Sequence, residues 1–337
     1  MKSLRLGVVG TGHLGRIHAR LIPRVDGADL VAIADPSPTS LAAADVPPAV
    51  TRHADHRDML GRVDAVVVAS PTGTHAAVVG DCLAAGKHVL CEKPLTIDAS
   101  DARRLAMRAG AAGLILQVGH VERFNPALTA LDDLGRDVRY VDAVRASSFP
   151  GRCLDVGVVM DLMIHDLDLI LSLAQSPVVD VRATGAVVVS DHEDVAEARI
   201  EFASGMVASV RASRIDTGAC RKMRIAGERG SAEIDFQTPS IRVVRHSDVV
   251  RRGEFDLSIA TDNPLTYRDE LFATHLRCEE LSLTPRNAIL DELHDFVLSV
   301  TTGCSPVVDG HAAAAAVDLA QRITHQISRP SRQRIAA

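Results

Sequence analysis

The feature that most constrains this chain is a glycine-rich segment near its start, Gly10-Thr11-Gly12-His13-Leu14-Gly15. An apolar run at residues 4–9 leads into it, and a helical pattern follows at once. In a G-x-G-x-x-G segment the first glycine permits a tight turn, the second admits a pyrophosphate, and the third lets strand and helix pack closely. The N–H groups of the following helix would then face the phosphates. Three glycines at this spacing also occur by chance, so the flanking strand and helix carry the prediction of a dinucleotide site.

The first third of the chain alternates apolar strand patterns with helical patterns, which is typical of a parallel sheet covered on both faces. A polar, irregular stretch at 119–126 then indicates the crossing into a second domain. We therefore expect a Rossmann dinucleotide-binding domain at 1–121 and a substrate-binding domain at 122–329. The last residues, 330–337, are expected to form a flexible tail. The expected strands are 4–9, 30–34, 65–69, 87–91 and 114–118, and the expected helices are 15–21, 75–85 and 98–110.

The second domain is predicted to be α+β. A long helix is expected at 155–174, and period-two segments separated by turns follow, which favours an antiparallel meander. Two closing helices are expected at 287–301 and 310–327. The expected strands of the meander are 181–189, 196–202, 207–213, 222–225, 231–236 and 241–244.

Polar residues follow several of the predicted parallel strands, at the sheet edge where ligands of such folds bind. Asp35 follows Gly15 by 20 residues, and a carboxylate there accepts hydrogen bonds from the ribose hydroxyls and repels a 2′-phosphate. NAD is therefore favoured over NADP, although a turn or cap role for Asp35 before Pro36 is the alternative. The segments Ser70–His75 and Glu92–Pro94 are expected at the same edge.

Two further features point to chemistry. Lys93 would place a cation at the ligand edge of the sheet, although a lone lysine there is usually only solvated, and Glu92 is expected to be structural. The helix at 155–174 contains no Lys, Arg or Glu. Its polar positions fall on one stripe at spacings of four, three and four, which favours a buried helix facing a wet cavity over a surface stripe. The stripe consists of Asp161, His165, Asp168 and Ser172.

These residues, taken together, resemble the Gfo/Idh/MocA oxidoreductase family. The resemblance rests on GTGHLGRIHAR at 10–20, AGKHVLCEKPL at 85–95 and DLMIHDLD at 161–168, and it covers about residues 4–327. It implies a Rossmann domain followed by an α+β domain with a large open antiparallel sheet. That sheet often pairs between subunits in the family, which implies a homodimer or homotetramer. The family's E-K-P lysine corresponds to Lys93, and its D-x-x-x-H pair corresponds to Asp161 and His165.

Within the family, GHVERFNPA at 119–127 is similar to the branch that contains UDP-N-acetylglucosamine 3-dehydrogenases. The segments at 158–173 and 212–225 point the same way, whereas 219–228 departs from the branch. The resemblance implies oxidation of the 3-hydroxyl of a UDP-N-acetylhexosamine by NAD. Inositol or free-sugar dehydrogenase and ketosugar reductase are the alternatives within the enzyme class, and a non-catalytic NAD-binding sensor is the alternative outside it. A methyltransferase is disfavoured by the long second domain and by the placement of Lys93.

The expected catalytic residues are Lys93, Asp161 and His165. A histidine titrates near pH ~6.5, whereas a lysine starts near ~10.4. We therefore favour His165 as the base, oriented by Asp161, with Lys93 as a cation on the reacting oxygen; the reverse assignment stays open. The expected substrate-binding residues are Lys93, His120, Arg123, Asn125, Asp161 and His165. The expected cofactor-binding residues are Gly10, Thr11, Gly12, His13, Leu14, Gly15, Asp35, Ser70, Pro71, Thr72, His75, Glu92 and Lys93.

Charge, cysteine spacing and hydropathy limit the kinds of ligand and the cell compartment that we expect for this protein. The net charge is −6, which argues against nucleic acid as a ligand. The six cysteines show neither a C-x-x-C pair nor zinc spacing, so we expect no metal site and a reduced, cytoplasmic protein. A strand within about four residues of the start leaves no room for a signal peptide, and no apolar run reaches the ~18 residues of a membrane span. A small-molecule sugar or nucleotide-sugar is the expected partner.

Overall fold

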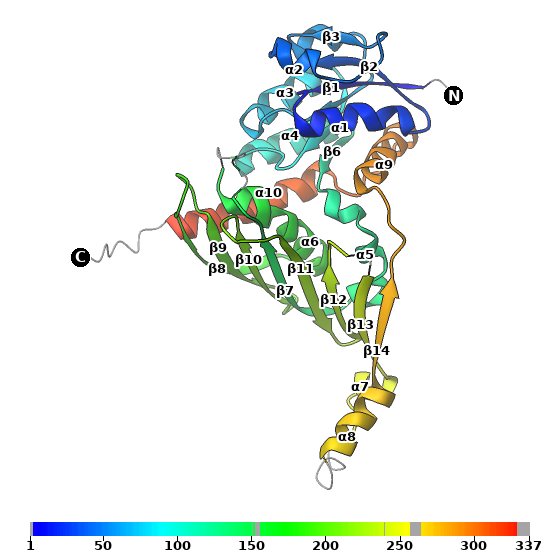
Figure 1. Ribbon diagram of the computed structural model, residues 1–337, viewed down its shortest axis with the longest axis vertical. Coiled ribbons are helices and arrows are strands. Elements are labelled where there is room, and N and C mark those ends of the chain that lie inside the picture. The colour runs from blue at the N-terminus through cyan, green and yellow to red at the C-terminus, as the bar shows by residue number, and fades with distance from the viewer. Residues whose placement is uncertain (1–2, 150, 152–155, 239, 257–263, 329–337) are drawn as a thin grey trace, which may run out of the picture. The chain divides into compact units, whose positions relative to one another are not determined.

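The computed structural model describes residues 3–149, 151, 156–238, 240–256 and 264–328, so the predicted tail at 330–337 lies outside the described residues. The chain divides into two compact units, each built around its own sheet (Figure 1). The first unit comprises Met1–Phe124 and Asn287–Gln321, and the second comprises Asn125–Arg286 and Arg322–Ala337. The crossing thus lies close to the expected one, but residues 287–321 return to the first unit, whereas the sequence placed all of 122–329 in the second.

The first unit contains the expected parallel sheet. Its six strands lie in the order β3-β2-β1-β4-β5-β6, and every adjacent pair is parallel. This is the strand order of a Rossmann fold, with its topological switch point between β1 and β4. The strands are β1 (Leu4–Val9), β2 (Ala28–Ala34), β3 (Thr51–His53), β4 (Ala65–Val68), β5 (His88–Glu92) and β6 (Leu116–Gly119).

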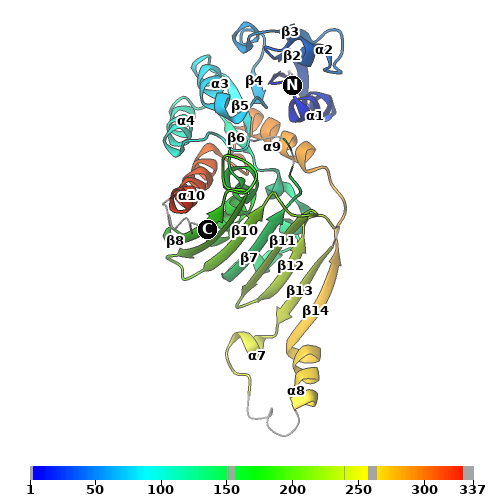
Figure 2. The same cartoon turned by 60° about the vertical axis from the view of Figure 1, so that its left-hand side comes forward.

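Helices cover both faces of this sheet, with α1 and α9 on one side and α3 and α4 on the other (Figure 2). The apolar face of α9 explains why the chain returns to this unit. Leu293 and Phe296 are fully buried in the same cluster as Leu6 of β1 and Ile33 of β2. The helical elements are α1 (His13–Leu21), α2 (Pro38–Ala42), α3 (Thr72–Ala84), α4 (Ala99–Ala111), α9 (Ala288–Thr302), the first part of α10 (Gly310–Ser328) and the short 3₁₀ turns η1 (Ile22–Arg24), η2 (His56–Met59) and η3 (Val121–Phe124).

The second unit contains an eight-stranded sheet in the order β14-β13-β12-β11-β7-β10-β9-β8. All adjacent pairs are antiparallel except β7 and β10, which are parallel. The expected large antiparallel sheet is therefore confirmed, although β7 and β14 were not among the predicted strands. The strands are β7 (Val138–Ala146), β8 (Val178–Ala186), β9 (Val195–Phe202), β10 (Val207–Ser213), β11 (Cys220–Gly227), β12 (Gly230–Asp235), β13 (Ser240–His246) and β14 (Leu276–Ser282).

One expected helix of this unit differs from the prediction. The segment predicted as a single helix over 155–174 begins with a π-helical turn, η5 (Val159–Met163), and continues as α6 (Ile164–Ala174). Asp155 lies outside the described residues. Together η5 and α6 pack against the central strands β7 and β10. The unit also contains α5 (Pro126–Thr129) and the 3₁₀ turn η4 (Asp132–Gly135).

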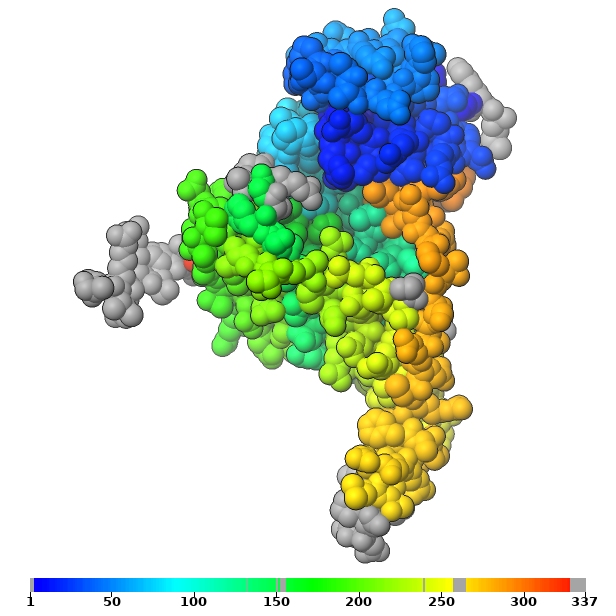
Figure 3. Space-filling model, viewed as in Figure 1, coloured from blue at the N-terminus to red at the C-terminus, as the bar shows by residue number. Residues whose placement is uncertain are grey.

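The connection between β13 and β14 extends beyond the ends of those strands (Figure 3, yellow). It contains α7 (Asp248–Arg251), α8 (Pro264–Glu270) and a π-helical turn, η7 (Leu271–His275). The ring of Phe255 packs against Tyr267 and His275, with centroids 5.8 and 5.0 Å apart respectively. Within the described ranges, every helix is too short or too polar to cross a membrane.

Candidate active site

The glycine loop has the geometry that a dinucleotide needs. Gly10 adopts φ +86°, and a Cβ there would lie 2.6 Å from the carbonyl oxygen of Ala69. A Cβ at Gly15 would overlap the carbonyl of Gly10, so strand and helix approach too closely for any side chain. Gly12, in contrast, faces open space, and no side chain caps the α1 helix that begins after it. An open glycine at an uncapped helix N-terminus is a fit for a pyrophosphate.

Asp35 supports this loop directly. Its Oδ2 accepts hydrogen bonds from the Thr11 backbone N–H at 2.7 Å and the Thr11 hydroxyl at 3.1 Å. Its Oδ1 accepts from the Ser37 N–H at 2.8 Å. The turn role considered as the alternative for Asp35 is therefore present, and the carboxylate also ties the end of β2 to the glycine loop. Its contact with a ribose stays a prediction, and the side chain is half-buried beside the loop.

The segment Ser70–His75 follows β4, across the switch point from the glycine loop. His75 is 1% exposed, and its Nδ1 lies 2.9 Å from the Pro94 carbonyl oxygen. Its Nε2 lies 2.8 Å from the Ser70 carbonyl oxygen. Both ring nitrogens thus contact backbone carbonyls, so His75 links the loops that follow β4 and β5. Its predicted contact with the cofactor stays a prediction. Thr72 is the first residue of α3.

Glu92 closes β5 with a contact inside the unit. Its Oε1 lies 2.7 Å from Nε2 of His18, which is buried on α1. Burial alone would raise the pKa of the Glu92 carboxyl, but the hydrogen bond and charge of His18, followed by the charges of Lys93 and His75, lower it. Glu92 therefore carries a negative charge beside Lys93. Glu92 thus has a structural contact, as expected, but the sequence did not indicate that His18 would be its partner.

The residues predicted at the crossing fall in different environments. His120 follows β6 and is 1% exposed. Arg123 lies in η3, at the end of the first unit. Asn125 opens the second unit, where its Oδ1 accepts a hydrogen bond from the Ala127 N–H at 3.0 Å and caps α5. Asn125 thus has a helix-capping role, and the substrate contacts of all three remain predictions.

In the second unit, the π-helical turn carries Asp161, and the first turn of α6 carries His165; both side chains are half-buried. The rest of the predicted stripe is used inside the protein, because Asp168 is 2% exposed and the Ser172 hydroxyl donates to the Leu169 carbonyl at 2.7 Å. Of the stripe, Asp168 is therefore buried, whereas Asp161, His165 and Ser172 are partly exposed. π-Helical turns are rare and recur at functional sites.

Two contacts hold the start of this helix in place. Glu193 accepts hydrogen bonds from two N–H groups at the helix start: its carbonyl from Val158 at 2.8 Å and its Oε1 from Val159 at 3.3 Å. A Cβ at Gly157 would overlap the Glu193 carboxylate, so a larger residue there would force Glu193 out of this position. The neighbouring carboxylate, Asp194, pairs at 2.9 Å with Arg214, which is itself 0% exposed and donates to the Val156 carbonyl.

Comparison with known proteins assigns both units to one family. The sequence profile of the oxidoreductase family with an NAD-binding Rossmann fold, Gfo/Idh/MocA, matches residues 4–120, and its C-terminal domain profile matches 137–233. A UDP-N-acetylglucosamine 3-dehydrogenase of Acidithiobacillus ferrooxidans is 33% identical over 313 residues, which is 93% of each chain. The chain belongs to the Gfo/Idh/MocA oxidoreductase family. It is accordingly an NAD-dependent dehydrogenase of the class that acts on CH–OH groups.

Two further comparisons show which kinds of dehydrogenase this Gfo/Idh/MocA protein resembles. A crystal structure of the Acidithiobacillus ferrooxidans enzyme has a TM-score of 0.82 with it at 31% identity, covering 97% of this chain and 98% of the other. An inositol 2-dehydrogenase of Rhizobium meliloti is 27% identical over 345 residues, which is 97% of each chain. Dehydrogenases of both nucleotide-sugars and inositols are therefore among its relatives.

The sequence did not reveal the ion pair that anchors α6 to the sheet. Arg145 of β7 contacts Asp166 through Nε and Nη2 at 2.8 and 2.9 Å, and both side chains are at most 4% exposed. Arg145 also lies over the ring of Phe236, 5.8 Å from its centroid. Asp166 adjoins His165, so this pair fixes the backbone of the family's D-x-x-x-H segment. No sequence signal joins two residues 21 positions apart, on a strand and a helix.

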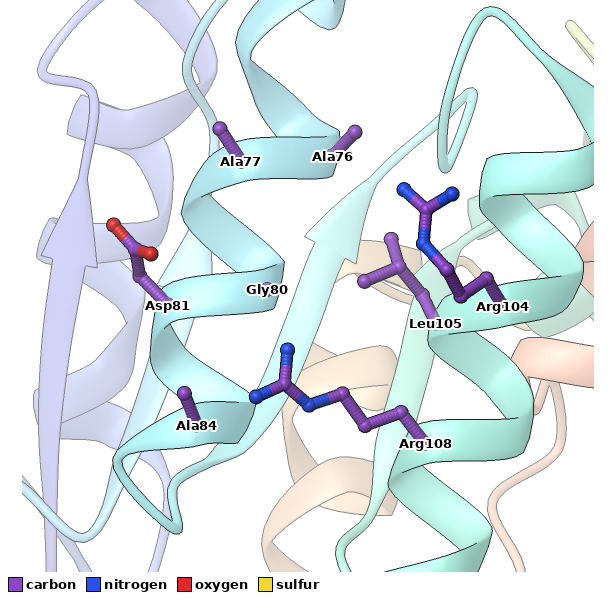
Figure 4. Close-up of a pocket in the computed structure, with 8 residues that line it drawn as sticks. All are labelled: Ala76, Ala77, Gly80, Asp81, Ala84, Arg104, Leu105 and Arg108. Atoms are coloured by element: carbon purple, nitrogen blue, oxygen red, sulfur yellow. The ribbon is translucent and has the colours of Figure 1, made fainter.

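A surface groove of about 390 Å³ lies elsewhere in the first unit, between α3 and α4 (Figure 4). Small side chains of α3 face Leu105 and two arginines of α4 across it. None of the predicted site residues of this Gfo/Idh/MocA protein lines the groove, so it is separate from the ligand edge of the sheet. Its lining residues are Ala76, Ala77, Gly80, Asp81, Ala84, Arg104, Leu105 and Arg108.

Proposed function

We propose that this protein oxidises the 3-hydroxyl of a UDP-N-acetylhexosamine, with NAD as the oxidant. The observation that carries the proposal is the 33% identity, over 93% of both chains, with a UDP-N-acetylglucosamine 3-dehydrogenase. The fold of that relative matches over nearly the whole chain, both units included. Inositol oxidation is the competing activity, because an inositol 2-dehydrogenase also matches over 97% of this chain, at 27% identity.

In the proposed reaction the hydride passes to the cofactor, and side chains of the protein handle the proton and the charge. NAD, held by the glycine loop and Asp35, would supply the acceptor for the hydride that leaves the carbinol carbon as its C=O bond forms. His165 accepts the proton of the hydroxyl group, and Asp161 one turn earlier orients its imidazole. Lys93 remains a cation and stabilises the negative charge that develops on the reacting oxygen. The ionised Glu92 beside Lys93 supports the cationic role.

The cofactor assignment draws on the first unit alone. Gly10, Gly12 and Gly15 shape the loop for a pyrophosphate, and Asp35 is the proposed partner of the adenosine ribose. We further propose that the protein works in the cytoplasm, as its cysteine spacing indicates, and that it forms a homo-oligomer, as the family resemblance implies. Sedimentation at several protein concentrations would test the oligomer, and a monomer throughout would exclude it.

A substrate screen tests the function. The purified protein is mixed with NAD and either UDP-N-acetylglucosamine, UDP-N-acetylgalactosamine, N-acetylglucosamine or myo-inositol, and the absorbance of reduced nicotinamide is followed. Single-turnover conditions keep a tightly held cofactor visible. We expect reduction with a UDP-sugar and a product lighter by two hydrogens in the mass spectrum. Turnover of myo-inositol or the free sugar alone would contradict the proposal.

A further inference from the structure

A buried group of three ionisable side chains lies in the first unit, and the proposed chemistry does not use it. His18 comes from α1, Glu92 from the end of β5 and Glu292 from α9, which belongs to the returning segment of the chain. His18 and Glu292 are each 1% exposed, and the Glu92 side chain is 12% exposed. One nitrogen or oxygen atom from each residue lies within 4.8 Å of the other two.

One carboxyl group of this cluster, that of Glu292, has an oxygen atom without a hydrogen-bond donor among the described residues. His18 Nε2 and Glu92 Oε1 are 2.7 Å apart. Glu292 Oε1 is fully buried and, among the described residues, meets no hydrogen-bond partner. A buried carboxylate without donors is costly, and a second carboxylate nearby makes it costlier. A proton on Glu292 removes both penalties.

Two neighbouring carboxylates also favour the protonated form of Glu292. Burial, followed by the carboxylates of Glu92 and Asp295, raises the pKa of Glu292 well above its usual value. The elements that pack most closely against α9 are η3, which carries Glu122 and Arg123, and η1, which carries Arg24.

The same three side chains could hold a metal ion, but their geometry favours a proton. Donor atoms that share a tetrahedral metal through bonds of ~2.0 Å lie about 3.3 Å apart. The 2.7 Å between His18 and Glu92 is a hydrogen-bond length instead.

We infer that Glu292 is a neutral, buried carboxylic acid that packs against Glu92 and so positions the adjoining residue, Lys93. With Glu292 neutral, Glu92 is the single carboxylate of the cluster, and its charge pairs with His18 and Lys93. Glu292 is thus a positioning residue that acts on Lys93 through Glu92. The catalytic part of the inference rests on the proposed function, whereas the protonation state does not.

Infrared spectroscopy and stability measurements test the protonation state. At neutral pH the wild type should show the carbonyl band of a protonated carboxyl group, which Glu292→Gln removes. Glu280→Gln, which removes the charge of an exposed glutamate on β14, should keep the band. Because the folded pKa of Glu292 is raised, the wild type should lose stability relative to Glu292→Gln as pH rises above ~4.3, the unfolded value. A wild type without the band contradicts the inference, as does Zn²⁺ that raises its Tm but not that of Glu292→Gln.

Chemical labelling and kinetics test the positioning of Lys93. The rate at which an amine reagent modifies Lys93, read by mass spectrometry, should change in Glu292→Ala and match the wild type in Glu292→Gln. This readout needs no substrate, so it stands even if the proposed substrate fails. With a substrate in hand, Glu292→Ala should lower kcat by about 100-fold, as a small misplacement does, and leave KM for NAD unchanged. Equal labelling in all three proteins, or a Gln variant as impaired as the Ala variant, would overturn the positioning role. If Glu292→Ala does not fold, Glu292→Asp, which shortens the side chain but keeps the acid, takes its place in the same comparison.

Discussion

His165 combines a fixed backbone with a partly open side chain. The next residue, Asp166, is locked to Arg145, and the turn before it is held by Glu193. The imidazole itself is half-buried on α6. The fixed backbone limits where the ring can lie, while an outside group can still reach it, and both suit a general base.

Replacing His165 by alanine should therefore lower kcat by ~10²- to 10⁴-fold, the range of general acid–base catalysis. NAD binding, measured by calorimetry, should be unchanged because the cofactor residues lie in the other unit. His311→Ala, at an exposed position on α10, is the control and should keep full activity. A His165→Ala variant with near-wild-type kcat would favour Lys93 as the base.

Asp35 has two functions that one substitution can separate. In Asp35→Asn the side-chain oxygen still accepts from the Thr11 N–H, so the loop should hold its shape. The charge that repels a 2′-phosphate is lost, which at ~4 Å in water is worth ~1 kcal/mol, or about fivefold in affinity. The KM for NADP should fall by that factor relative to the KM for NAD. An unchanged ratio would mean that Asp35 serves only the turn.

At the level of elements, the position of α6 depends on a buried ion pair. Asp166→Ala leaves the Arg145 guanidinium buried without its carboxylate, and we expect a loss of about 3–5 kcal/mol in the free energy of unfolding. The matched control is Asp180→Ala, whose partner Arg182 is 82% exposed. Pairs of that kind contribute at most ~1 kcal/mol. Urea denaturation of both variants checks the contrast, and equal effects would refute it.

The π-helical start of the same helix depends on a glycine. A methyl group at Gly157 would overlap the Glu193 carboxylate, so Gly157→Ala should cost about 1–3 kcal/mol and displace Asp161. Gly61→Ala introduces the same methyl group into open space and should change neither stability nor kcat. Thermal unfolding and steady-state kinetics provide the comparison. Should Gly157→Ala behave like Gly61→Ala, the collision is not what holds the turn.

Local signals predicted the elements well where residues close in sequence determine them. The glycine loop, five of the six parallel strands and the start of α10 follow from apolar runs and turn residues, and the structure places them within a few residues of the prediction. The short edge strand β3 was not predicted. The meander from β8 to β13 was equally visible. The edge strand β14 was not, because its side chains are mostly exposed and show no apolar alternation.

Contacts between residues far apart in the chain could not be predicted from the sequence. Nothing near His18 indicates that it will meet Glu92, 74 positions away, or that Glu292 will join them. The same holds for Arg145 with Asp166 and for Asp35 with Thr11. The catalytic candidates were found because chemistry restricts their residue types, whereas their supporting partners depend on the tertiary fold.

At the scale of the whole molecule, the cofactor unit depends on residues far along the chain. Phe296→Ala should reduce the free energy of unfolding by about 3–5 kcal/mol, because Phe296 is fully buried in the core beneath the Rossmann sheet. Leu298→Ala, on the same helix but 58% exposed, should cost little. The protection that NAD gives against thermal unfolding should weaken only in the first variant. Equal stabilities would show that α9 is dispensable to this core.

The division of the chain into units also has a consequence for its synthesis. The first unit is finished only when residue 321 has been made, after residues 125–286 of the second unit. A nascent chain that has already released its glycine loop and all six parallel strands still lacks Phe296 and Glu292, and so lacks part of the core beneath them. The cofactor unit is therefore completed only after nearly the whole second unit has been made. A ribosome that stalls late would leave an exposed apolar sheet for chaperones to shield, although nearly every residue predicted to touch NAD had been made long before.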